Sequence, residues 1–141
     1  MNAAVLYWSN TGNTRLVAET IIRSLERDGV DVSVAADLTR APLEESARID
    51  WFSFDLVCLG FPVNQWSPVR SVQKLLQLKL DEYRAQGRVR LGAPPIPGKH
   101  ALVFCTYSGP HTGIDEALPA VKYSGQFFAH LGFDVVDDWC I

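Results

Sequence analysis

Apolar residues occur along this chain in short runs that predict strands. Largely apolar runs cover residues 3–8, 55–61 and 100–107, and such runs are typical of strands that are buried on both faces of a sheet. Residues 30–34 instead alternate between apolar and polar side chains, which predicts a strand at the margin of the sheet with one buried face. A last strand is predicted over residues 133–141.

Stretches with the helical period separate these strands. Residues 13–27 are amphipathic with one apolar face. A further helix is predicted to start at Pro68. Residues 114–131 predict another helix, in which Pro119 is tolerated only near the first turn. Residues 81–98 are charged and then rich in Pro and Gly, so we expect a long connection there.

The alternation of strands and helices predicts an α/β fold, in which helices cover a parallel sheet. The alternating pattern places the second strand at an edge, and the continuous runs place the first, third and fourth strands inside the sheet. This distribution favours a doubly wound five-stranded sheet with the order 2-1-3-4-5. Because 141 residues suit one domain, we predict a single domain over residues 1–141.

Charge and apolar content exclude several classes of protein. The chain has 13 basic and 16 acidic residues, a net charge of −3, and its bases are scattered rather than gathered in a stripe that would indicate nucleic-acid binding. No apolar run approaches the length of a membrane span, and no basic segment precedes the first strand, as a secretory signal would require. We therefore expect a cytoplasmic protein without a nucleic-acid or membrane partner.

The three cysteines, Cys58, Cys105 and Cys140, lie in apolar runs. This placement predicts reduced thiols packed in strands, which agrees with a cytoplasmic location. The cysteines, histidines and acids show no spacing typical of metal ligands, so no metal site is predicted.

The first strand is followed by six consecutive polar or glycine residues, 9–14, which we name the first loop. A helix N-terminus offers unpaired N–H groups and the positive end of a dipole, and both suit a phosphate. Gly12 lets the backbone approach a ligand, and the hydroxyl groups can donate to phosphate oxygens. A plain helix cap would use one or two such residues, so the loop favours phosphate binding.

Other functional classes fit this sequence less well. Neither the Gly-Lys-Ser/Thr of a P-loop nor the G-x-G-x-x-G of a dinucleotide-binding fold is present. The first loop has no cysteine for a cysteine-dependent phosphatase, and Trp8 stands where a receiver domain would need an acid. Ser108, His111 and Asp115 lie too close in sequence for a hydrolytic triad, and the elbow G-x-S-x-G is absent. We assign no catalytic residue.

Residues 7–14 resemble the FMN-phosphate loop of the flavodoxin family, S/T-x-T-G-x-T, and stand in the corresponding place after the first strand. The resemblance extends along the chain up to the fifth strand and implies a flavodoxin-like fold. It also implies FMN as the cofactor, bound where the strand order switches direction, between strands one and three.

The resemblance implies that two further loops surround the flavin ring. The second loop, residues 61–68, follows the third strand, and the third loop, residues 106–113, follows the fourth. Trp66 and Tyr107 are the aromatic residues expected to flank the ring. In this family a peptide of the second loop adapts to the redox state of the flavin, and Asn64 is expected at or beside it because Asn tolerates left-handed backbone angles. The candidate residues for FMN binding are Ser9, Asn10, Thr11, Gly12, Asn13, Thr14, Pro62, Val63, Asn64, Gln65, Trp66, Thr106, Tyr107, Ser108, Gly109, His111, Thr112 and Gly113.

The sequence thus predicts an FMN-binding electron-transfer protein with redox proteins as partners. Two alternatives stay open, an NAD(P)H-dependent FMN or quinone reductase of the same fold and an interaction module without flavin. The chain ends in the fifth strand, where the family continues into a helix. We therefore expect apolar side chains of strands three, four and five to be exposed on one face, to be covered by a second copy, a partner or an additional domain.

Overall fold

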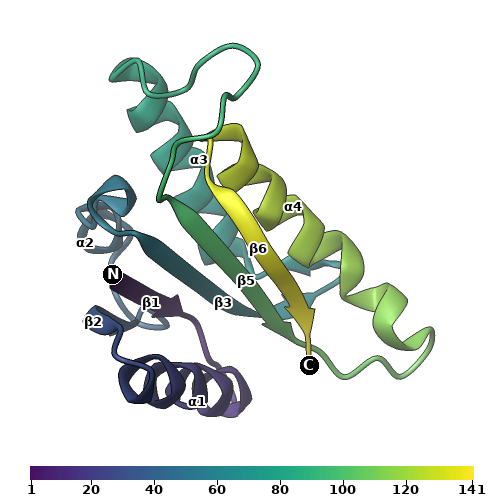
Figure 1. Ribbon diagram of the computed structural model, residues 1–141. Coiled ribbons are helices and arrows are strands. Elements are labelled where there is room, and N and C mark those ends of the chain that lie inside the picture. Colours follow the sequence, from purple (N-terminus) through teal and green to yellow (C-terminus); the bar gives the residue numbers. More distant parts are fainter.

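A computed structural model describes all 141 residues, which form one parallel sheet with helices on both faces (Figure 1). The strand order is β2-β1-β3-β5-β6, and a two-residue strand, β4, pairs antiparallel with the end of β3. This order confirms the predicted flavodoxin-like 2-1-3-4-5 pattern. The strands are β1 (Asn2–Tyr7), β2 (Asp31–Asp37), β3 (Leu56–Asn64), β4 (Ser67–Pro68), β5 (His100–Thr106) and β6 (Asp134–Cys140).

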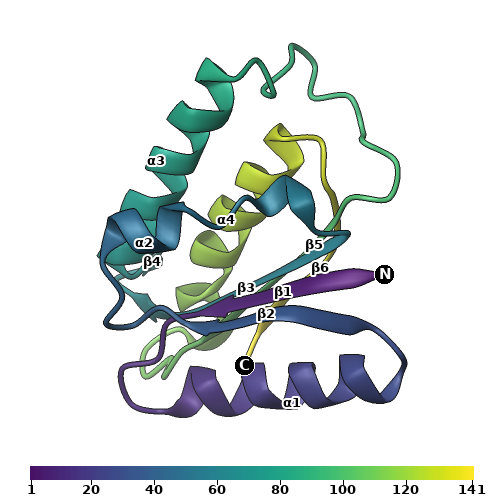
Figure 2. The ribbon, with the colours of Figure 1, turned by 90° about the vertical axis from the view of Figure 1, so that its left-hand side faces the viewer.

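Four α-helices cover the sheet unequally. Helix α1 lies alone on one face, and α2, α3 and α4 lie on the other (Figure 2). No helix combines the length and the apolar character that crossing a bilayer would require. The helices are α1 (Asn13–Arg27), α2 (Leu43–Ala47), α3 (Arg70–Ala85) and α4 (Leu118–His130), with two short 3₁₀ turns, η1 (Trp51–Ser53) and η2 (Gly113–Glu116).

Helix α3 continues further than the sequence predicted. The expected connection over residues 81–98 is wrong at its start, because residues 81–85 complete the helix. Tyr83 is fully buried there, so the charged residues around it form the outer side of a helix that packs on the core. The helix predicted over residues 114–131 starts later than expected, because α4 begins at Leu118 and a 3₁₀ turn precedes it; Pro119 therefore lies in the first turn, where proline is tolerated.

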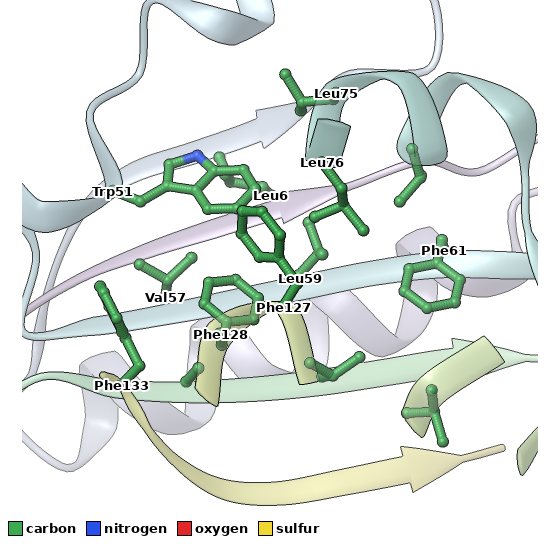
Figure 3. Packing of buried hydrophobic residues seen from close by; sticks show 14 of the residues in the cluster. Leu6, Trp51, Val57, Leu59, Phe61, Leu75, Leu76, Phe127, Phe128 and Phe133 are labelled. Carbon is green, nitrogen blue, oxygen red and sulfur yellow. The ribbon is translucent and has the colours of Figure 1, made fainter. Parts of the chain in front are cut away.

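The larger part of the core lies between the sheet and helices α3 and α4, and it is rich in aromatic rings (Figure 3). Trp51 stacks on Phe128 with 5.3 Å between ring centroids and meets the edge of Phe127 at 5.4 Å. Aromatic pairs of this geometry add about 0.5–1.5 kcal/mol beyond their buried area. Together with Phe133, these rings fix η1 and α4 against the sheet.

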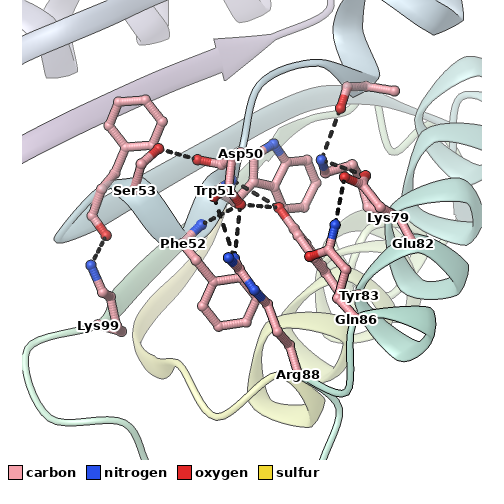
Figure 4. Close-up of polar contacts among 12 residues, drawn as sticks. Asp50, Trp51, Phe52, Ser53, Lys79, Glu82, Tyr83, Gln86, Arg88 and Lys99 are labelled. Atoms are coloured by element: carbon pink, nitrogen blue, oxygen red, sulfur yellow. Dashed lines mark hydrogen bonds and ion pairs between the residues drawn. The ribbon is translucent and has the colours of Figure 1, made fainter.

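A polar cluster fixes the end of α3 at the amino end of the sheet (Figure 4). The Tyr83 hydroxyl accepts a hydrogen bond from the Trp51 N–H at 2.8 Å and donates to Asp50 Oδ1 at 3.2 Å. Arg88 donates to both carboxylate oxygens of Asp50, at 3.1 and 3.3 Å. Burial raises the pKa of Tyr83, so the hydroxyl stays protonated.

Lys79 belongs to the same cluster and is fully buried. Its Nζ donates to the Ala47 carbonyl and to the Glu82 carboxylate, each at 2.8 Å, and lies 4.6 Å from the centroid of the Tyr83 ring. A buried ammonium group is tolerated only when it is paired in this way. We call Asp50, Lys79, Glu82, Tyr83 and Arg88 the α3 cluster.

On the α1 face, the side chains of β3 and β5 are buried, which contradicts the expectation that they would be exposed. Phe104 is fully buried, and its ring lies on Gly60, where an added Cβ would come within 2.0 Å of the ring. The missing side chain at Gly60 lets Phe104 lie flat beneath α1. The buried side chains on this face include Leu56, Cys58, Leu102 and Phe104.

The expectation of exposed apolar residues holds only at β6. This strand forms an edge of the sheet, and Val136, Trp139 and Ile141, at its end, are exposed by 54%, 40% and 51%. An edge strand presents unpaired N–H and C=O groups in addition to these side chains.

All three cysteines are free. Cys58 and Cys105 are buried in strands, as predicted, and burial raises the pKa of Cys58 to about 12. Cys140 is half-buried and is the register partner of Cys105 in the neighbouring strand. Burial raises the pKa of these two thiols as well, so all three are protonated at neutral pH.

Candidate cofactor-binding site

The first loop turns the chain sharply from β1 into α1. Gly12, at the N-cap position, has a φ of 97°, a left-handed angle that favours glycine. The Gly12 carbonyl accepts the first helical hydrogen bond from the Leu16 N–H at 3.1 Å. The Ser9 hydroxyl accepts from the Arg15 N–H at 3.1 Å, so Ser9 satisfies one donor of the helix N-terminus.

Consecutive backbone donors of this loop remain free. The N–H groups of Thr11, Gly12, Asn13 and Thr14 meet no acceptor within the protein. They lie at the positive end of the α1 dipole, and the first turn of α1 carries no acidic residue. Consecutive free amides of this kind suit the oxygens of a bound phosphate.

The Thr14 hydroxyl has a different partner from the one expected. Thr14 is 1% exposed, and its Oγ1 lies 2.8 Å from Oγ1 of Thr106. This hydrogen bond joins the first loop to the start of the third loop. Thr14 therefore places its free amide at the candidate phosphate position while its hydroxyl holds the two loops together.

The loop after β2 completes the surroundings of the first loop. Thr39 Oγ1 accepts from the Ser9 N–H at 2.8 Å, and Asp37 accepts from the Thr39 N–H at 3.0 Å. Residues of both loops line an open hollow of about 930 Å³ that has no apolar lining residue. These lining residues are Ser9, Asn10, Thr11, Gly12, Arg15, Asp37, Thr39 and Arg40.

The sequence analysis missed Arg15, Asp37, Thr39 and Arg40. The sequence did indicate Asp37, Thr39 and Arg40, because these polar residues lie at the end of the second strand or directly after it. The predicted strand order places that strand beside the first strand and therefore beside the first loop. Arg15 directly follows the motif in α1.

The second loop forms a tight hairpin. β3 continues to Asn64, and β4 returns antiparallel with Asn64 opposite Ser67. Gln65 and Trp66 form the turn with φ angles of 48° and 63°, which are uncommon for residues other than glycine. The left-handed positions are thus the two residues after Asn64, while Asn64 itself lies in the strand.

The Trp66 side chain is 61% exposed, so it is not packed beneath its own loop. It extends from a turn at the carboxyl end of β3 and has a free aromatic face. Pro62 and Val63, the other candidates of this loop, lie in β3 and are half-buried.

The third loop is held at both ends. The Tyr107 N–H donates to the Ile141 carbonyl at 3.1 Å, and the Tyr107 side chain packs against the core. The Glu116 carboxylate accepts from the N–H groups of Thr112 and His111, each at 2.9 Å. These two hydrogen bonds lower the pKa of Glu116. Glu116 organises this loop, and the sequence analysis did not identify it.

Gly109 is the closely packed glycine of the third loop. It has a φ of 55°, and an added Cβ would lie 2.8 Å from the Tyr107 ring. Its missing side chain therefore leaves room for that ring. The remaining candidates, Ser108, His111, Thr112 and Gly113, are exposed along the loop.

The three loops lie together at the carboxyl end of the sheet, because β1, β3 and β5 are adjacent and parallel. The Thr14–Thr106 hydrogen bond connects the first and third loops directly. The hollow beside the first loop does not extend to Trp66 or Tyr107. The polar part of the site is thus separate from the aromatic residues predicted to flank the ring.

Comparisons with known proteins identify the fold. Neither a family model nor a curated protein matches the sequence. Among solved structures, a flavodoxin from Streptococcus pneumoniae TIGR4 superposes with a TM-score of 0.70 at 15% identity, over 99% of this chain and 83% of that one. A flavodoxin from the domain Archaea gives a TM-score of 0.61 at 21% identity, over 100% and 82% of the chains.

The chain has the flavodoxin-like fold. The same fold occurs within larger proteins, such as the flavodiiron core of Flv1 from Synechocystis sp. PCC6803, with a TM-score of 0.68 at 21% identity. This chain is covered to 99% in that comparison but spans only 30% of the flavodiiron chain. At these identities the likeness concerns the fold, so function has to be argued from the site.

The residues present suit FMN in two respects. The free amides of the first loop match a phosphate, and the exposed Trp66 offers a face to an aromatic ring. FMN joins a phosphate and a flat aromatic ring in one molecule, and the loops that offer these two features end neighbouring strands.

Proposed function

We propose that this chain binds FMN without a covalent bond and transfers electrons between redox partner proteins in the cytoplasm. The observation that carries the proposal is the set of four free amides at the N-terminus of α1, beside loops that contain aromatic residues. Bound FMN would supply the redox chemistry, and the protein would supply binding and orientation.

In this proposal the first loop holds the phosphate. The N–H groups of Thr11, Gly12, Asn13 and Thr14 donate to its oxygens, and the hydroxyl of Thr11 is a further donor. Hydrogen bonds to a charged group each contribute about 1.5–3 kcal/mol. Several such bonds at a helix N-terminus are sufficient to fix one end of the cofactor.

The ring then lies between the second and third loops. Trp66 is free to stack on one face of the ring, and Tyr107, anchored through its backbone to Ile141, borders the other. Gln65 and Trp66 have left-handed backbone angles, so in this proposal a strained peptide would border the ring. This turn, rather than Asn64, is the segment best suited to adapt to the redox state of the flavin.

An absorbance spectrum and an FMN titration test this proposal. Purified protein, or protein reconstituted with FMN, should show the flavin absorbance bands at about 375 and 450 nm and retain them after gel filtration. A protein that retains no FMN would contradict the proposal and support an interaction module without flavin.

The same preparation separates a carrier from a reductase. Solved structures that superpose on this chain include a WrbA-like protein from Agrobacterium tumefaciens and a flavone reductase, with TM-scores of 0.67 and 0.69. The preparation is mixed with NADH or NADPH and with a quinone or free FMN, without a partner protein. If the protein is an electron carrier, the nucleotide should not be oxidised. Catalytic oxidation of the nucleotide would favour the reductase.

A further inference from the structure

We infer that Arg15 and Arg40 hold the phosphate group of the ligand and make the site select a phosphorylated flavin over riboflavin. This inference rests on the proposed function, since it names the residues that set the ligand specificity of the same site. The observations that carry it are that both arginines line the hollow of the first loop and that neither forms a close ion pair within the protein.

Arg15 occupies a position where a cation is electrostatically unfavourable in the free protein. It lies in the first turn of α1, at the positive end of the helix dipole. Its Nη2 lies 3.8 Å from the position of an added Cβ on Gly12, so the guanidinium group is beside the free amides. An anion bound at those amides would turn this repulsion into attraction.

The neighbouring acids form no close ion pair with Arg15. Glu19, one turn further along α1, reaches Arg15 only at 4.0 Å, and both side chains are about half exposed. Exposed ion pairs of this kind contribute little to stability. Asp37, the acid of the hollow, accepts hydrogen bonds from the backbone and hydroxyl of Thr39.

Arg40 approaches from the other segment that lines the hollow. It follows Thr39 in the loop after β2, and it forms no ion pair or hydrogen bond within the protein. Two arginines on different segments can therefore contact one group in the hollow. A guanidinium group matches phosphate oxygens with two parallel hydrogen bonds.

The chemistry of the two flavins then decides the specificity. FMN carries a phosphate monoester with nearly two negative charges at neutral pH, and riboflavin carries a hydroxyl in its place. The amides alone would bind either group through hydrogen bonds. The arginines add attraction that only the charged group receives.

Parallel titrations with FMN and riboflavin test this inference in the wild type and in Arg15→Gln, Arg40→Gln and the double variant. Arg23→Gln is the matched control, because Arg23 is exposed on the same helix and donates to Thr20 rather than to the hollow. We expect each single variant to lose about tenfold in FMN affinity and to keep its riboflavin affinity. The control should change neither, and the double variant should show a weaker dependence of FMN affinity on salt.

Two results would overturn the inference. One is an unchanged FMN affinity in the double variant. The other is an equal loss for FMN and riboflavin, which would indicate a structural role for the arginines.

Inorganic phosphate separates this inference from the proposed function. If the wild type binds no FMN, the proposed function fails, and thermal unfolding with phosphate against chloride at equal ionic strength tests the arginines alone. A higher Tm with phosphate in the wild type, but not in the double variant, would support phosphate binding by the two arginines. If phosphate does not raise the Tm of the wild type, the inference is overturned as well.

Discussion

Two polar regions lie at opposite ends of the sheet, and they differ in how their hydrogen bonds are satisfied. In the α3 cluster, at the amino end, Lys79 and Tyr83 are fully buried and have partners within the protein. In the first loop, at the carboxyl end, four successive amides have none. Polar groups that satisfy one another stabilise the fold, whereas groups that remain free can bind a ligand.

The two regions also differ in the balance of charge. In the α3 cluster, Lys79 is paired with Glu82, and Arg88 with Asp50. Around the first loop, Arg15 has only a distant acid and Arg40 has none. Substitutions in the α3 cluster should therefore change stability without changing FMN binding, and substitutions in the first loop should weaken FMN binding.

The largest effect is expected for Gly12→Val in the first loop. A β-branched residue at a φ of 97° is strained, so the loop would shift its amides away from the phosphate. We expect FMN affinity to fall by about 30-fold or more, the equivalent of ~2 kcal/mol, in a fluorescence titration. Gly29→Val is the control, because Gly29 has a φ of 82° far from the loop. A similar loss of affinity in both variants would show that strain at either end of α1 is sufficient.

The converse test is Tyr83→Phe in the α3 cluster. Removal of the hydroxyl leaves the buried backbone N–H of Trp51 without its acceptor. We expect the free energy of unfolding to fall by about 1.5 kcal/mol, measured with urea, with FMN affinity unchanged. Tyr123→Phe, at an exposed position, should change neither quantity. Weaker FMN binding by Tyr83→Phe would mean that the two regions are coupled.

A smaller, pH-dependent effect is expected in the third loop. The pKa of Glu116 in the folded protein lies below its ordinary value of 4.5, so its carboxylate stabilises the loop above about pH 4.5. This stabilisation is lost as the pH falls through the lower folded pKa. Protection of the His111 and Thr112 amides against hydrogen exchange should decrease in that range. Glu116→Gln should show weak protection at every pH, and protection that equals the wild type at neutral pH would exclude this role.

The smallest effect is expected at the β6 edge, where Val136, Trp139 and Ile141 are exposed. Edge strands with apolar side chains tend to pair with another chain, so we expect weak self-association that increases with concentration. A charge at the edge opposes such pairing, and Val136→Lys should shift the sedimentation velocity toward a monomer. A wild type that remains monomeric at all concentrations would contradict this expectation.

The sheet order and the first loop could be predicted because their signals are local. Continuous and alternating apolar runs distinguish inner strands from an edge strand, and the motif of residues 9–14 is contiguous. The end of α3 could not be predicted, because Tyr83 and Lys79 are buried only through partners more than 30 residues away, Trp51 and Ala47.

Other parts of the site depend on contacts that no local pattern reveals. Glu116 acts through the backbone of two preceding loop residues, which becomes evident only from the loop conformation. The turn at Gln65 and Trp66 adopts left-handed angles without a glycine, so the usual sequence signal of such a turn was missing. The apolar side chains of β5 on the α1 face are buried, contrary to the expectation for that face, and the space above Gly60 allows Phe104 to be among them.

The most direct test of the central claim is an NMR titration that follows each backbone amide while FMN or riboflavin is added. FMN should shift the amide resonances of Thr11, Gly12, Asn13 and Thr14 strongly, because these N–H groups would donate to the phosphate. Riboflavin, whose neutral hydroxyl is a weaker acceptor than a charged phosphate, should shift these resonances much less while it shifts those of Trp66 and Tyr107. If FMN binds and the four amides of the first loop do not respond, the phosphate lies elsewhere and the account is wrong.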